Sequence, residues 1–373
     1  MRFGRGSGTG KGFVLVALAC GLALLAFPQK KKEVTQTLQV PKDLPIAVEG
    51  DPRHFTFHVT PLSSKGLLSK QVRDALGALS REAKGPILKI RAFVAGSGDA
   101  RRVRDLVSEV FTDRREPLPV LSLVQAGGLP LEGAQVVLEG IAVGRREVSP
   151  FGLVFISAQV ATSENPLDPV APLAAKSLEG LRAAVKAAAS EPADVLRLTC
   201  FLSSLDNLQD TRKLVEAEYP RAAANYVQPQ RSPGRALAAC EAVARLRWNT
   251  GSNLQLLNPE GMPREAAHSQ IALVGAPKVV LTGSQVSFGF AEKDARLAFE
   301  RLQKALEQSG ASMRSVAFAH YYPLGTAITG HIRKVSAEFF DTARSPAGSL
   351  LLFEGLPSMD AGFAMDVVAV KLP

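Results

Sequence analysis

Apolar positions beyond residue 46 recur in the same order three times along the chain. Each pass has strand-like and helix-like runs in the order strand, long helix, strand, second helix and two closing strands, with the opening strand least marked in the first pass. The long helices are indicated by apolar residues at helical spacing, namely Leu68, Val72, Leu76 and Leu79; Leu178, Leu181, Val185 and Ala188; and Ala295, Ala298, Phe299, Leu302 and Leu306. The pattern predicts a tandem repeat of one α+β module.

The remaining elements of the three passes follow the same periodicity. The second helices are expected after a cap at Asp99, after a cap at Asp206 or Asn207, and along Ile328–Phe339. The strands are expected at residues 87–96, 120–126, 134–143, 152–160, 194–202, 225–230, 235–246, 278–286, 313–322, 349–357 and 362–372. Helices on one face of each mostly antiparallel sheet leave the other face bare, and three modules in one chain can cover these faces for one another.

These passes divide the chain into an N-terminal segment and three modules. The segment and tether occupy residues 1–46, and the modules occupy 47–148, 149–250 and 251–373, the first being the most divergent. The chain is therefore expected to act as a monomer in which three modules form a pseudo-trimer.

The N-terminal segment carries an uncharged apolar run, Phe13–Phe27, behind Arg2, Arg5 and Lys11. Basic residues followed by a short apolar run are typical of a secretory signal. The run is shorter than the roughly 20 residues of a usual membrane span, but the basic residues 30–32 that follow it favour an uncleaved anchor. The folded part is therefore expected to be exported (periplasmic or extracytoplasmic) or tethered to a membrane by this segment.

Composition changes this picture little. Hydrophobic residues make up 46% of the chain, enough for a large core, and the net charge is +9. Residues 1–46 hold seven Lys or Arg and two acidic residues, so five of the nine net charges lie there. The body is only mildly basic and has no dense basic stripe with stacking aromatics, which argues against nucleic-acid binding.

Cysteine and histidine give no strong signal. Three cysteines cannot form a disulfide framework, and Cys200 and Cys240, in strand-like runs, are interpreted as small buried apolar residues. A Cys200–Cys240 bridge remains an alternative if the chain is exported. The five histidines are scattered, and His54 and His58, which could share a strand face, have no third ligand nearby. No metal and no cofactor are predicted.

Several motifs carry a family resemblance. The second pass contains FISAQ, ADVLRLTCFLSSLDNL and CEAVA; the third contains HSQIALVGAPKVVLTGSQ, ALEQSGASMRSVAFAHYY and GLPSMDAGFAMDVVAV; the first contains SLVQAGGLPLEGAQVVLEGIAV. In this order they resemble the Rid/YjgF family of reactive-intermediate deaminases, which includes endoribonuclease L-PSP-like proteins. The resemblance implies chorismate-mutase-like modules, which in the family assemble as homotrimers with ligand pockets between neighbours.

The resemblance also implies a site that this chain has partly lost. Family members hydrolyse imines and enamines, and an Arg in the penultimate strand holds the substrate carboxylate through a bidentate guanidinium. The corresponding positions here are Leu121, Ala224 and Gly348. In the second copy a nearby Arg221 or Arg231 could replace the missing cation.

Other family positions are retained. The acidic residue of the last strand is present as Glu139, Glu241 and Asp366; it could orient water as a general base or serve a structural role, and the sequence does not decide between these. Candidate ligand-binding residues beside the pockets are Ser157, Gln159, Ser284 and Gln285.

Three functions follow from these observations. A scaffold without its Arg favours a protein that binds a small metabolite between modules and is not an active deaminase. The alternatives are an imine or enamine hydrolase with a different Arg, and a structural or interaction scaffold. Export argues against the hydrolase, because the family's substrates arise among cytoplasmic enzymes.

Overall fold

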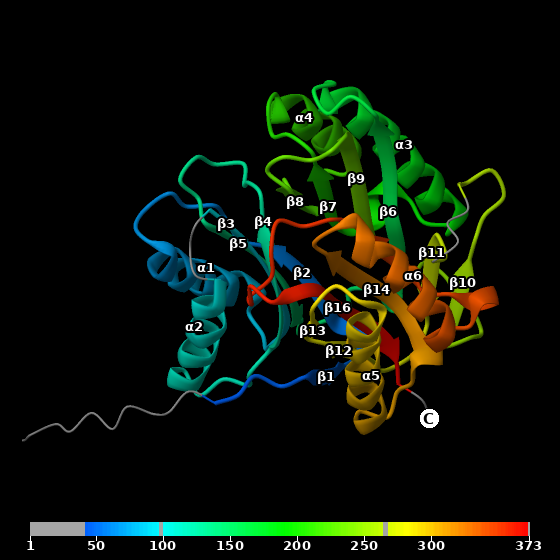
Figure 1. The fold of residues 1–373 in the computed structure, drawn as a ribbon. Helices are drawn as coiled ribbons and strands as arrows, with labels where there is room; N and C mark the ends of the chain where they lie inside the picture. The colour runs from blue at the N-terminus through cyan, green and yellow to red at the C-terminus, as the bar shows by residue number, and fades with distance from the viewer. Residues whose placement is uncertain (1–41, 97–99, 264–267, 372–373) are drawn as a thin grey trace, which may run out of the picture. The chain divides into compact units, whose positions relative to one another are not determined.

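The computed structural model describes residues 42–96, 100–263 and 268–371, within a folded unit that runs from Gln39 to Pro373 (Figure 1). The helices are α1 (Leu68–Ala83), α2 (Ala100–Asp113), α3 (Val170–Ala187), α4 (Leu208–Glu218), α5 (Glu292–Gln308) and α6 (Thr326–Phe339). The strands are β1 (Ala47–Gly50), β2 (Phe55–Val59), β3 (Ile87–Ala95), β4 (Val120–Ala126), β5 (Val136–Val143), β6 (Leu153–Ser163), β7 (Val195–Leu202), β8 (Ala223–Val227), β9 (Ala236–Arg245), β10 (Leu254–Leu257), β11 (Ile271–Val274), β12 (Val279–Thr282), β13 (Gln285–Phe288), β14 (Val316–Pro323), β15 (Ala347–Leu350) and β16 (Ala361–Val370).

Two predicted features fall on residues that are not described. The apolar run Phe13–Phe27 and the helix cap at Asp99 both lie outside the described residues. Within the described part of the chain, no helix has the length and apolar character needed to cross a membrane. The other predicted cap is observed in part: Asn207 is the N-cap of α4, with φ of 55°, but its side chain makes no capping hydrogen bond.

The strands form three sheets that repeat one order. The first is β2-β5-β3-β4, the second β10-β11-β6-β9-β7-β8, and the third β1-β12-β16-β14-β15, with β13 also paired to β16. In each sheet the strand second from one edge (β3, β7 or β14) pairs in parallel with the edge strand (β4, β8 or β15). On its other side it pairs antiparallel with β5, β9 or β16. The mixed α+β class predicted from the periodicity is therefore confirmed.

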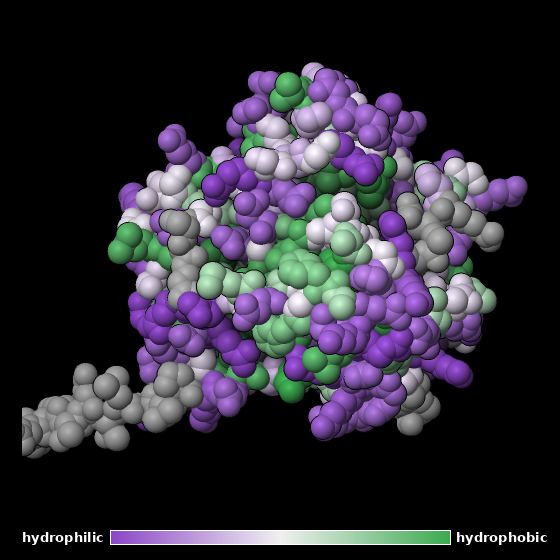
Figure 2. All heavy atoms as spheres, viewed as in Figure 1, coloured by the Kyte–Doolittle hydropathy of each residue, from purple (hydrophilic) through white to green (hydrophobic). Residues whose placement is uncertain are grey.

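Each pair of helices packs on one face of its own sheet. In the first repeat Val72, Leu76 and Leu79 of α1 are fully buried against apolar residues of α2, β3 and β5. Equivalent clusters join α3 and α4 to the second sheet and α5 and α6 to the third. Residues three or four apart share a helix face, so the opposite faces stay polar, and Figure 2 shows the outer surfaces of α2 and α5 as mostly hydrophilic.

The opposite sheet faces contribute to two apolar clusters that contain residues of all three repeats. In one cluster the rings of Phe155 and Phe318 lie 5.7 Å apart. In the other cluster the ring centroid of Phe201 lies 6.0 Å from that of Phe93 and 5.7 Å from that of Phe353. The three repeats therefore share core residues and cannot bury these faces separately.

Two strand arrangements differ from the simple expectation. The run 278–286, expected to be one strand, is divided into β12 and β13, which both pair with β16. Between them the register shifts by one residue, since Leu281 lies opposite Val368 and Gln285 opposite Met365. Three strands also join a sheet of a different repeat from the one in whose sequence range they lie. β1 pairs with β12 of the third sheet, and β10 and β11 extend the second sheet.

The cysteine interpretation is confirmed for burial and wrong for the unpaired thiols. Cys200 of β7 and Cys240 of β9 are directly opposite residues of neighbouring strands, and they form a disulfide with Cα atoms 4.1 Å apart. Both are fully buried. The alternative that the sequence left open for an exported chain is the one observed.

Candidate functional site

The three acidic residues kept from the family pattern meet in one buried cluster. Each lies opposite a residue of the neighbouring strand: Glu139 opposite Arg91, Glu241 opposite Thr199, and Asp366 opposite His320. These pairs occupy the same place in each sheet. The side chains of the three acids are at most 2% exposed.

Arg91 lies between two of these carboxylates. Its Nε donates to Glu139 Oε2 at 2.8 Å and its Nη2 donates to Glu241 Oε1 at 2.7 Å. Arg197 also pairs with both carboxylates, at 3.8 Å from Glu139 and 3.3 Å from Glu241. Burial raises the pKa of a carboxyl, but Arg91 holds the pKa of Glu241 well below its usual range, helped by His320.

Asp366 has its own set of partners. Its carboxylate forms a buried ion pair with Lys89, lies 3.1 Å from His320 Nδ1 and accepts a hydrogen bond of 2.8 Å from the Tyr322 hydroxyl. Burial alone would raise the pKa of Asp366, but Lys89 and His320 keep it well below its usual range. His320 Nε2 lies 3.2 Å from Glu241 and so joins the two halves of the cluster.

The cluster predicts how stability depends on pH. Because the pKa of Asp366 is lower in the folded than in the unfolded chain, its stabilising contribution is complete above about pH 4 and is lost as the pH falls through the folded value. We expect Asp366→Asn to lower stability at neutral pH and to make the acid-side loss shallower. Urea unfolding across this pH range measures both. If the free energy of unfolding fell equally steeply with decreasing pH in the variant and the wild type, the lowered pKa of Asp366 would be contradicted.

This geometry favours the structural alternative for Glu139, Glu241 and Asp366, since each carboxylate is buried and held by cations. The basic partners were missed in the sequence. Lys89 and Arg91 stand two residues apart in an otherwise apolar strand, and so share one face of it. That spacing of charge within a buried run is the signal that could have revealed them.

The repeats meet at three junctions, where β2 contacts β8, β6 contacts β15 and β12 contacts β4. The junction of β6 with β15 is closed. Ser157 Oγ accepts a 2.8 Å hydrogen bond from Gly348 N and donates one of 2.6 Å to Ser269 O. A Cβ at Gly348 would lie 2.6 Å from Ala319 O, so this family-Arg position has no room for a side chain.

The junction of β12 with β4 is also closed, by a 3.1 Å hydrogen bond from Ser284 N to Leu121 O. The two glutamines of the family pattern are hydrogen-bonded within the protein. Gln159 Nε2 donates to Gln270 Oε1 at 2.9 Å and Gln285 Nε2 to Gly283 O at 3.4 Å. Ser157, Gln159, Ser284 and Gln285 therefore make hydrogen bonds within the protein and do not line the open cleft described next.

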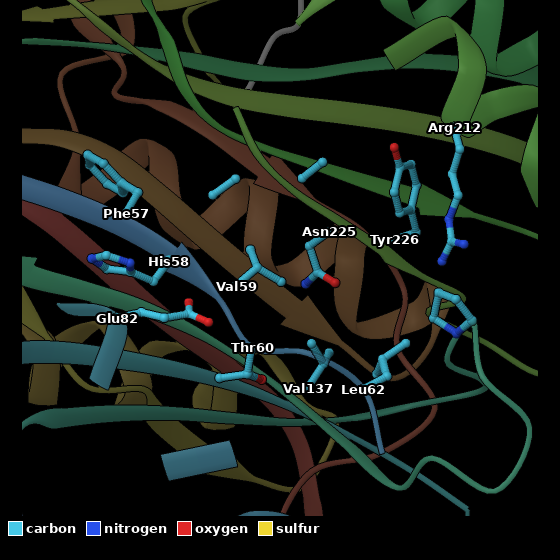
Figure 3. A pocket seen from close by; sticks show the side chains of 13 residues that line it. Phe57, His58, Val59, Thr60, Leu62, Glu82, Val137, Arg212, Asn225 and Tyr226 are labelled. Carbon is cyan, nitrogen blue, oxygen red and sulfur yellow. The ribbon is translucent and has the colours of Figure 1, made fainter. Parts of the chain in front are cut away.

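The junction of β2 with β8 is open (Figure 3). It holds a cavity of about 380 Å³ whose wall includes Ala224, the family-Arg position of the second repeat. The lining residues are Phe57, His58, Val59, Thr60, Leu62, Glu82, Pro130, Val137, Arg212, Ala223, Ala224, Asn225 and Tyr226.

The cleft has two polar ends. At one end Arg212 of α4 lies over the ring of Tyr226, 5.6 Å from its centroid, and Figure 3 shows the two side by side. No carboxylate among the described residues forms an ion pair with Arg212. Burial raises the pKa of Tyr226 to about 12, so its hydroxyl stays neutral. The predicted replacements Arg221 and Arg231 do not line the cleft.

His58 and Glu82 lie at the opposite end of the cleft in Figure 3. His58 Nε2 lies 3.0 Å from Thr56 Oγ1. Burial lowers the pKa of His58, although Glu82 acts in the other direction, so the imidazole is uncharged at neutral pH. This end offers hydrogen-bonding groups and one carboxylate.

No family model matches the chain, and no curated protein does. A crystal structure from Yersinia pestis, described as a protein of unknown function of the conserved Rid family, matches with a TM-score of 0.30 and 16% identity over 32% of this chain and 99% of its own. A YjgF family member from Neisseria meningitidis has a TM-score of 0.24 and 13% identity over 32% and 96%. Another family member, from Mycobacterium tuberculosis, has a TM-score of 0.24 and 21% identity over 31% of this chain and 98% of its own. The Rid/YjgF family, expected from the sequence motifs, is thus the family of these similar structures, each matching about a third of the chain.

Proposed function

We propose that this chain binds a small organic anion, a carboxylate above all, in the cleft between β2 and β8. The observation that carries the proposal is Arg212, a guanidinium without an ion-pair partner among the described residues, on the wall of a cavity of about 380 Å³. Small-molecule sites are mostly apolar clefts of about this size with a few placed polar groups. A guanidinium offers a carboxylate two parallel donors.

The proposed binding protein is a monomer whose modules, at 47–148, 149–250 and 251–373, form a pseudo-trimer around the charge cluster. The support is that the first repeat contacts the second, the second the third and the third the first, each time through an opening and a penultimate strand. A closed head-to-tail ring has this property. The Cys200–Cys240 disulfide supports export to an oxidising compartment, with the N-terminal run as signal or membrane anchor.

Binding is favoured over imine or enamine hydrolysis. A hydrolase of the family type would use the acidic residue of the last strand to orient water. Glu139, Glu241 and Asp366 are all enclosed in ion pairs, and none of them lines the cleft.

Replacing Arg212 with Gln is expected to weaken binding of a small carboxylate such as α-hydroxyisocaproate by about tenfold to a hundredfold, as is usual when a charge-assisted hydrogen bond is lost. Isothermal titration calorimetry on the full chain measures this. Arg221→Gln and Arg231→Gln are matched controls, since neither residue lines the cleft. Equal weakening by all three would point to general charge attraction, and no effect of Arg212→Gln would contradict the proposed site.

A further inference from the structure

Asn225 connects the cleft to the buried charge cluster. It lies on β8, is 3% exposed and lines the cleft. Its Nδ2 donates a 2.7 Å hydrogen bond to Glu139 Oε1, which belongs to another repeat. The same place in the other two repeats is held by serines, Ser122 and Ser349, which follow Leu121 and Gly348 as Asn225 follows Ala224.

The orientation of the Asn225 amide is fixed by its partner. An ionised carboxylate only accepts hydrogen bonds, and Glu139 also accepts them from Thr199 Oγ1 at 2.7 Å and from Arg91 Nε at 2.8 Å. Turning the amide over would place its oxygen against a carboxylate oxygen in a buried site. The Nδ2 group must therefore point toward Glu139.

The amide oxygen consequently points away from the carboxylate. In Figure 3 the oxygen of Asn225 lies on the side of the cleft where Tyr226 and Arg212 stand. No donor among the described residues bonds to this oxygen. The floor of the cleft thus presents a fixed hydrogen-bond acceptor, while Arg212 on the wall presents donors.

We propose that Asn225 determines specificity: the cleft selects organic anions that also carry an N–H or O–H donor, such as hydroxy or amino acids, over anions that offer only acceptors there. This inference rests on the proposed carboxylate site at Arg212. A ligand carbonyl placed opposite the Asn225 amide oxygen would leave that buried oxygen without a donor, and the two oxygens would repel each other. Sites built to bond a donor discriminate strongly against analogues that lack it.

The test compares two acids of nearly equal size, α-hydroxyisocaproate and α-ketoisocaproate, by calorimetry on the full chain. The wild type is expected to bind the hydroxy acid at least about tenfold more tightly. Asn225→Leu, of similar volume, is expected to lose this preference while keeping affinity for the keto acid. Asn225→Ser, which copies the other repeats, is too short to present an acceptor to the cleft and is expected to lose it too.

The outcomes separate this inference from the site on which it rests. Equal wild-type affinity for both acids, with both weakened by Arg212→Gln, would overturn the role of Asn225 and leave the carboxylate site intact. A preference that survives both Asn225 variants would also overturn it. Failure of both acids to bind the wild type would overturn the specificity role and the carboxylate site together.

Discussion

Arg91→Met is expected to lower the free energy of unfolding by about 3–5 kcal/mol, because it leaves two buried carboxylates without their main cation. Arg91 is 2% exposed and bonds both Glu139 and Glu241. Methionine fills much of the same space, so the loss comes from uncompensated charge and little from a cavity. Urea unfolding followed by circular dichroism at neutral pH measures the change.

A matched control is available on the surface. Arg182 pairs with Glu218, but its side chain is 60% exposed, and exposed pairs contribute below about 1 kcal/mol. Arg182→Met should therefore have a small effect on the same measurement. Similar losses for the two variants would show that Arg91 is solvated and that the buried cluster is not a stability element.

Replacing both Cys200 and Cys240 with Ala is expected to lower the free energy of unfolding by about 2–4 kcal/mol. The bridge joins residues 40 apart in the sequence, and cross-linking a loop of that length reduces the entropy of the unfolded chain by about this amount. The measurement is urea unfolding of the double variant against the wild type.

Thiol labelling supplies the control for the bridge itself. Wild-type protein unfolded without reductant should leave Cys200 and Cys240 unlabelled, and unfolding with reductant should label both. Labelling of these two residues without reductant, together with unchanged stability of the double variant, would contradict the observed pairing.

The helices and most strands could be predicted because their apolar spacing is a local property of the sequence. The register shift between β12 and β13 could not, since it arises where both strands pair with β16, about 80 residues further along the chain. At the shift Ser284 N donates to Leu121 O, which is also distant in the sequence. A local pattern carries no information about such partners.

The site was predicted in part for the same reason. The acidic residues were found because they hold one position of a repeat, but two of their ion pairs join different repeats: Lys89 pairs with Asp366, and Arg91 with Glu241. Arg212 was missed because a helix surface carries many such charges. Only the packing of β2 against β8 places it in a cleft.

The pairing of β1 with β12 sets the order in which the molecule can be completed. Ala47 pairs with Thr282, and Lys89 pairs with Asp366 near the other end of the chain. During synthesis β1 and Lys89 emerge long before these partners, so their contacts form late. A chain that stops early retains an unpaired strand edge and uncompensated buried charge, which gives proteolytic quality control a physical basis for distinguishing it from the finished protein.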